Sequence, residues 1–154
     1  MKVRRAFAKT LGLLHVLRAR AAFAGLDIAR TGLGFDKYWM DTVAHNIANV
    51  NTTTAPGQEP FRARMVVAMP IDTNSSQGGG VGVSAVLDQA GDAPLVYDPD
   101  NPIADEQGYV QGPVVDLAGQ LGDLILASRS YQANMSVFKE TRDSLQVATT
   151  LGRG

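Results

Sequence analysis

Cysteine is absent from this 154-residue chain. Its absence excludes disulfide frameworks, thiolate zinc sites and thiol nucleophiles. Long hydrophobic runs are missing too, because no apolar stretch reaches the roughly 18 uncharged residues that a membrane-spanning helix needs. The sequence therefore predicts a chain without a membrane span, although a cysteine-free chain suits either redox compartment.

Groups that carry chemistry are also scarce. His15 and His45 are the only histidines, and neither has a second ligand at metal spacing, so His45 is interpreted as a polar helix residue. Ser128 and Ser130 have no His and Asp nearby in sequence. The glycines at 78–80 lack the Lys-Ser/Thr of a phosphate-binding loop. We therefore predict no catalytic residue, no metal site and no cofactor; a small hydrolase is a competing hypothesis without a catalytic group.

Basic residues are missing between Arg64 and Arg129, a stretch that holds nine acidic residues. A segment of this sign repels phosphate backbones, so no nucleic-acid partner is expected. Residues 1–21 have the opposite character, with no acid and these cations: Lys2, Arg4, Arg5, Lys9, Arg18 and Arg20. We interpret residues 1–21 as a flexible basic N-terminal extension. A cleaved signal peptide and an upstream start codon stay open as alternatives.

A long helix with an apolar stripe is predicted for residues 22–50. Its first seven-residue row is Leu26, Leu33, Met40 and Ile47, and its second is Ala29, Val43 and Val50, interrupted by Asp36. This spacing is typical of a coiled-coil seam. The helix is expected to end near Asn49 to Asn51, because asparagine tolerates the left-handed conformation that closes helices.

Residues 52–113 have the composition of a small β-rich module. One strand is predicted at 62–69, and a second where Val81, Val83, Ala85 and Leu87 alternate with small residues. Short strands are expected at 95–97 and 109–110, and a flexible loop at 74–80.

Acidic residues gather between the two short strands. Asp98, Asp100 and Asp105 with Asn101 resemble a calcium loop in composition. Pro99 and Pro102 break the ligand spacing, so we predict a proline-stiffened turn instead.

A second long helix is predicted from Asp116, its expected N-cap, to Leu151. Its first seven-residue row is Leu117, Leu124, Tyr131, Phe138 and Leu145, and the weaker partner row is Leu121, Ser128, Met135, Arg142 and Thr149. The fold class is therefore mainly α, with long terminal helices forming an antiparallel coiled-coil-like pair that flanks a short irregular β domain. The helical core would comprise 22–51 and 114–154, and the middle module 52–113.

Periodicity alone leaves two interpretations of these helices open. They can form a self-contained hairpin packed on the β module, or they can be completed by neighbouring subunits. Burial of the stripes, at about 2 kcal/mol per large apolar side chain, does not clearly outweigh the ordering entropy of an isolated pair.

Two stretches resemble a known family. The first helix ends in Asn46, Ile47, Ala48, Asn49, Val50, Asn51 and Thr52, which resembles the N-terminal signature of flagellar rod, hook and hook-associated proteins. A second group, formed by Tyr97, Asp98, Pro99, Gly108 and Tyr109, resembles the proximal rod proteins of the FlgC family. The three asparagine amides at 46, 49 and 51 suit the end of the helix and the turn into the β module.

This resemblance implies a structural role in a rod that crosses the periplasm. The terminal helices would polymerise as the core of the axial drive shaft, after export through the flagellar type III apparatus. Implied partners are other rod proteins, neighbouring copies, the motor ring and the export apparatus. The predicted subunit interface is Leu26, Ala29, Leu33, Met40, Val43, Ile47, Val50, Leu117, Leu121, Leu124, Tyr131, Met135, Phe138 and Leu145. Arg129 and Tyr131 could hydrogen-bond across a subunit boundary. The alternative function is a membrane-associated helical adaptor anchored by the basic segment.

Overall fold

The structure, a computed structural model, describes residues 2–71 and 79–151. Its contacts divide the chain into two compact units. The first unit is Met1–Gly34, Pro70–Gly82 and Tyr131–Gly154, and the second is Phe35–Met69 and Val83–Ser130. The unit boundaries fall inside both long helices, and the predicted division into a helical core and a middle module stays a prediction.

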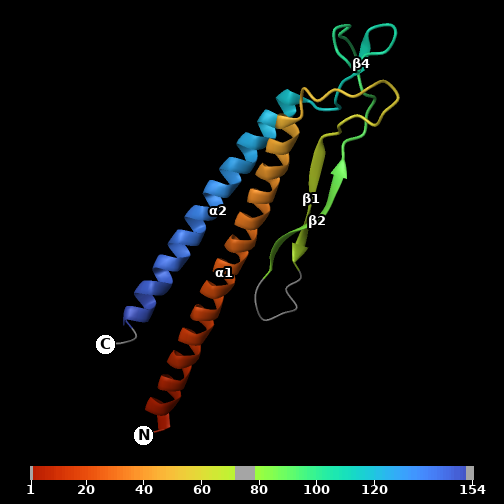
Figure 1. Ribbon diagram of the computed structural model, residues 1–154. Coiled ribbons are helices and arrows are strands. Elements are labelled where there is room, and N and C mark those ends of the chain that lie inside the picture. The colour runs from red at the N-terminus through yellow and green to blue at the C-terminus, as the bar shows by residue number, and fades with distance from the viewer. Residues whose placement is uncertain (1, 72–78, 152–154) are drawn as a thin grey trace. The chain divides into compact units, whose positions relative to one another are not determined.

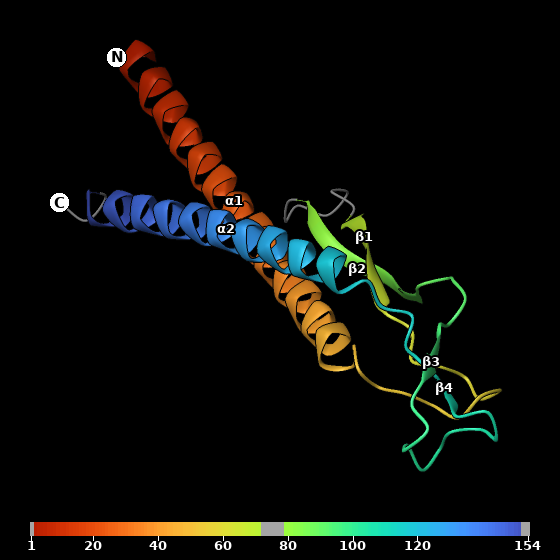
Figure 2. The ribbon, with the colours of Figure 1, turned by 90° about the horizontal axis from the view of Figure 1, so that it is seen from above.

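In chain order, one long helix precedes the four strands and one follows them, as the sequence predicts (Figure 1). The elements are α1 (Lys2–Ala48), β1 (Arg64–Ile71), β2 (Gly80–Asp88), β3 (Leu95–Tyr97), β4 (Tyr109–Gln111) and α2 (Leu117–Leu151). β1 pairs with β2, and β3 pairs with β4 in an antiparallel sheet whose strands are labelled in Figure 2. All four predicted strands are confirmed to within a few residues. The predicted loop at 74–80 lies outside the described residues except for 79 and 80.

Helix α1 begins at Lys2 rather than near Ala22. Residues 2–21 contain good helix formers such as Ala, Leu, Arg and Lys, with no proline. The helix therefore has no local reason to start later.

Helix α1 ends at Ala48, close to the prediction, but by a different mechanism. Within the described residues only glycines have positive φ, so the expected left-handed asparagine is wrong. Instead, the Asn49 side chain donates to the His45 carbonyl at 2.8 Å. The backbone N–H groups of Asn49 and Val50 donate to the carbonyls three residues earlier, at 3.2 Å each. This tightened last turn satisfies carbonyls that the helix end would otherwise leave open.

Helix α2 begins as predicted. The Asp116 carboxylate accepts a hydrogen bond from the Ala118 N–H at 3.1 Å, and the Asp116 carbonyl accepts one from the Gln120 N–H at 2.9 Å. These two bonds identify Asp116 as the N-cap. Over the residues that the structure describes, neither helix has an apolar stretch long enough to cross a membrane.

Candidate assembly interface

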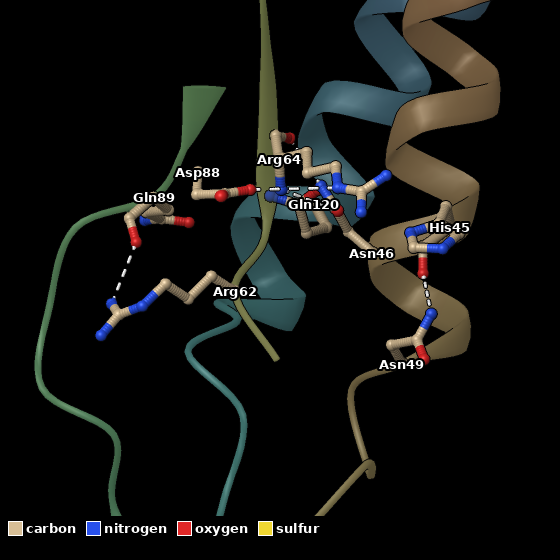
Figure 3. A network of polar contacts seen from close by, with 8 residues as sticks. All are labelled: His45, Asn46, Asn49, Arg62, Arg64, Asp88, Gln89 and Gln120. Carbon is tan, nitrogen blue, oxygen red and sulfur yellow. Dashed lines mark hydrogen bonds and ion pairs between the residues drawn. The ribbon is translucent and has the colours of Figure 1, made fainter. Parts of the chain in front are cut away.

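Asn46 is the polar centre of the second unit (Figure 3). Its side chain is 0% exposed and lies among α1, β1 and α2. The amide nitrogen donates to the Arg64 carbonyl at 2.8 Å and to the Gln120 Oε1 at 2.7 Å. The amide oxygen accepts from the Arg64 N–H at 2.9 Å. Asn46 thus pairs with the β1 backbone as a neighbouring strand would, and it joins that strand to both helices.

Residues before and after the motif make further contacts around the Asn46 centre. The His45 and Phe61 rings are 5.5 Å apart. Ala63, 1% exposed, donates its N–H to the Val114 carbonyl at 3.0 Å and accepts from the Gln89 N–H at 2.7 Å. Segments distant in sequence therefore meet at the start of β1.

Arg62 adds a further link to the same segment. Its Nη1 donates to the carbonyl of Gln89 at 3.3 Å and to that of Gly91 at 2.8 Å. The first of these bonds is drawn in Figure 3. The guanidinium is therefore used to fix a loop rather than offered to a ligand.

The second family motif forms the β3–β4 hairpin. Tyr97 and Tyr109 are directly opposite in the sheet, with ring centroids 5.3 Å apart in an edge arrangement. Gly108 has φ of 81°, and a Cβ there would lie 3.0 Å from both Pro99 Cβ and Tyr97 Cε2. Only glycine meets both demands, because other residues rarely adopt this conformation.

The acidic residues of this hairpin build turns. Asp98 accepts from the Asn101 amide at 3.0 Å. Asp105 accepts from the N–H groups of Gln107 and Tyr109, at 3.0 and 2.8 Å. Among the described residues, no group of three or more His, Asp or Glu side chains has metal-site geometry. Asp105 thus accepts from the backbone of the turn, and Asp98 accepts from the Asn101 side chain.

The predicted stripe of α1 is only partly inward. Ala29 and Val43 are each 2% exposed, whereas the rest of the predicted set is half-buried: Leu26, Leu33, Met40, Ile47 and Val50. The residues that meet α2 lie on a neighbouring row. A Cβ on Gly25 would lie 3.8 Å from Thr141 Cγ2, and one on Gly32 would lie 2.7 Å from Asn134 Nδ2. The first predicted row is therefore displaced by one residue from the row that contacts α2.

The predicted stripe of α2 is displaced in the same way. Gln120 and Ala127 are buried, at 8% and 0% exposed, and with Asn134 and Thr141 they form a row of seven-residue spacing. This row lies one residue before the predicted partner row. The remaining predicted residues are half-buried or exposed: Leu124, Tyr131, Met135, Phe138 and Leu145 are half-buried, and Leu117 and Leu121 are 41% and 47% exposed.

An exposed apolar ridge follows from this displacement. Leu117, Leu121 and Ile125 are spaced four residues apart in the second unit, and Ile125 is 55% exposed. Residues four apart are neighbours on a helix surface. We call Leu117, Leu121 and Ile125 the α2 ridge; the described residues leave its side chains 41–55% exposed.

Sequence reasoning missed Gln120 and Arg64 as parts of the Asn46 centre. A polar residue has no apolar periodicity, so the pattern gave no reason to select Gln120. The glycines offered a signal. Gly25 and Gly32 weaken a helix, and their lack of a side chain lets another segment approach closely. Their spacing of seven residues equals that of the inward row.

Comparison with known proteins relates the chain to flagellar rod proteins. The family described as flagellar basal body rod FlgEFG protein C-terminal matches residues 106–151. The flagellar basal-body rod protein FlgC of Yersinia enterocolitica is 38% identical over 127 residues, which are 82% of this chain and 95% of the relative. FlgC of Bacillus subtilis is 32% identical over 148 residues, which cover 86% of this chain and 99% of the relative. FlgC of Borreliella burgdorferi is 30% identical over 149 residues, which cover 86% of this chain and 98% of the relative. Because these similarities span most of the chain and nearly all of each relative, the chain belongs to the FlgC family of flagellar basal-body rod proteins.

Proposed function

We propose that this chain is a structural subunit of the proximal rod of the flagellar basal body, joined to neighbouring rod subunits through outward-facing apolar residues of its terminal helices. The relatives are named as rod proteins, which favours a structural role over an enzymatic one. The α2 ridge carries the proposal, because it is an apolar surface that the described residues leave about half exposed.

A coiled-coil-like pairing of α1 and α2 is part of this proposal. In the first unit, Gly25 is opposite Thr141 and Gly32 is opposite Asn134. In the second unit, Asn46 bonds Gln120. A step of seven residues along α1 matches a step of seven back along α2, which supports an antiparallel pairing with coiled-coil spacing.

The chemistry of this pairing explains why apolar residues remain for assembly. The contact positions carry small or polar residues, glycine against threonine or asparagine, so the helices approach closely without using their large apolar side chains. The burial of about half of a leucine or isoleucine by a neighbour would contribute about 1 kcal/mol for each side chain. Several such residues per subunit, repeated around a rod, would stabilise the assembly.

The partners in this proposal are other rod proteins and neighbouring copies of this chain. A clean deletion of the gene in its own host tests it. We expect non-motile cells whose basal bodies lack a complete rod, and motility restored by the wild-type gene. Normal swimming by the deletion strain, in a genome with no second copy of the gene, would contradict the proposal.

A further inference from the structure

A cavity of about 320 Å³ lies in the second unit beside the Asn46 centre. α1 contributes Trp39 and Val43 to its lining, and α2 contributes Gln120 and Asp123. Val43 and Gln120 are buried, and Trp39 and Asp123 are half-buried. The rest of the wall comes from β1, the start of α2 and Gln89, which follows β2. The cavity therefore has an apolar and amide base with an aromatic ring and a carboxylate on its wall.

The charged side chains that line this cavity differ in whether they have a partner within the chain. Arg64 lines it, but its Nε lies 3.9 Å from the Asp88 carboxylate. Asp116 also lines it, and one of its oxygens caps α2. For Asp123, no hydrogen bond or ion pair occurs with the side chains described at 23–71 and 79–150. The cavity thus offers an acceptor that this chain does not use.

A cavity lined by both an aromatic ring and an unused carboxylate has the chemistry that binds a guanidinium group. Arginine can stack its planar face on tryptophan while it donates two parallel hydrogen bonds to a carboxylate. Lysine can make neither the planar stack nor the paired bonds. The polar lining at Gln89 and Gln120 supplies further acceptors. The ligand class is therefore an arginine side chain.

The chain itself presents one suitable arginine. Of the arginines at positions 23–71 and 79–150, four have partners within the chain: Arg30, Arg62, Arg64 and Arg142. The remaining one is Arg129, which is exposed on α2. Arg129 is two residues beyond buried Ala127, or roughly 200° around the helix, so it faces away from the inward row.

Arg129 cannot fill the cavity of its own chain. It is six residues beyond Asp123 on the same helix, which is roughly 9 Å along the axis and on a different side. A neighbouring subunit can present the same arginine from outside.

Resting on the assembly role proposed above, we propose that this cavity binds the Arg129 side chain of a second copy of the chain. The contact is heterologous, with Arg129 on one copy and the Trp39 and Asp123 wall on the next. Such a contact propagates from subunit to subunit, as a ring or a helical array, because each copy offers both halves of it. It would set the lateral register of copies, while the α2 ridge supplies apolar burial.

An exchange of charges tests this contact in cells deleted for the native gene. Asp123→Arg and Arg129→Asp are introduced singly and together, and spreading in soft agar is measured. Each single variant should lose spreading by at least about tenfold, because a like charge faces the partner group. The double variant should recover it, since the pair is restored with the signs exchanged. Asp92→Arg, which reverses an exposed carboxylate outside the cavity, should spread as wild type.

Folding of each purified variant is checked by circular dichroism and by the emission of Trp39, the single tryptophan. If Asp123→Arg does not fold, the Arg129→Ala variant tests the contact instead. Arg129 is exposed, so its replacement by alanine should leave the fold intact. The proposal then requires that Arg129→Ala cells lose spreading in soft agar and that Lys139→Ala cells spread as wild type. Folded single variants that swim normally, or a folded double variant that does not recover, would overturn it. A deletion strain that swims would instead remove the rod function itself.

Discussion

Asn46 shows how one side chain can decide the local geometry of three elements. Both amide hydrogens and the amide oxygen are used, and the partners come from β1 and α2. Buried polar groups are tolerated when they are hydrogen-bonded, and they are costly when they are not. An asparagine at this position therefore specifies where the strand and the second helix must lie.

Replacement of Asn46 by leucine tests that role. The Asn46→Leu chain keeps the side-chain size but leaves the Arg64 N–H, the Arg64 carbonyl and the Gln120 Oε1 without their partner. We expect the free energy of unfolding to fall by about 3 kcal/mol, since each stranded group costs about 1 kcal/mol or more. Urea unfolding followed by circular dichroism measures the change.

Asn51→Ala is the matched control for that measurement. Asn51 belongs to the same motif but is exposed, so its loss should change the stability by less than about 0.5 kcal/mol. Equal losses for the two variants would show that the Asn46 bonds contribute nothing specific.

At the scale of elements, the sequence predicted much of the fold. The helix N-cap at Asp116, the end of α1 near Asn49 and all four strands follow from local signals: caps, asparagines and alternation. The orientation of the helices about their axes did not follow. Apolar periodicity identifies the most hydrophobic face of a helix. The inward face of α1 carries Gly25, Gly32 and Asn46, which a hydrophobicity pattern does not select. A helix that packs against its own chain and also against neighbouring subunits has two contact faces. A single hydrophobic repeat in the sequence cannot distinguish one face from the other.

Glycine substitutions in α1 test which face is inward. Gly32→Leu should destabilise the helix pair, because even a Cβ there would lie 2.7 Å from Asn134 Nδ2 and a longer side chain enters the contact. Gly34→Leu should be neutral or stabilising by up to about 1 kcal/mol, because nothing lies within 4 Å of its Cβ position and leucine favours helices. Thermal unfolding of the two purified variants distinguishes the positions. If Gly32→Leu were the more stable variant, the contact row would be misassigned.

At the scale of the whole molecule, burial determines which residues can report on assembly. Val43 was an attractive target in the sequence, but at 2% exposed it is part of the interior of its own chain. A charge there would unfold the second unit, so loss of motility would not identify an interface. The α2 ridge is suitable because its side chains are already in solvent.

The double variant Leu121→Glu with Ile125→Glu tests the ridge. These residues are 47% and 55% exposed, so the purified chain should keep its helicity and its stability to within about 1 kcal/mol. Motility should nevertheless be lost, because charges would be buried at the subunit boundary. Ser144→Glu adds a charge at an exposed polar position of α2 and should swim normally. Full motility of the double variant would exclude the ridge as an essential contact.

We propose that apolar residues left open by the helix pair are covered by neighbouring subunits in the rod. High-resolution electron cryomicroscopy of intact basal bodies from the native host measures this directly. We expect Leu117, Leu121 and Ile125 to be buried against an adjacent chain, and Asn46 to keep its hydrogen bonds within its own chain. A rod in which these three side chains face solvent, and the subunits touch only through their strands, would contradict it.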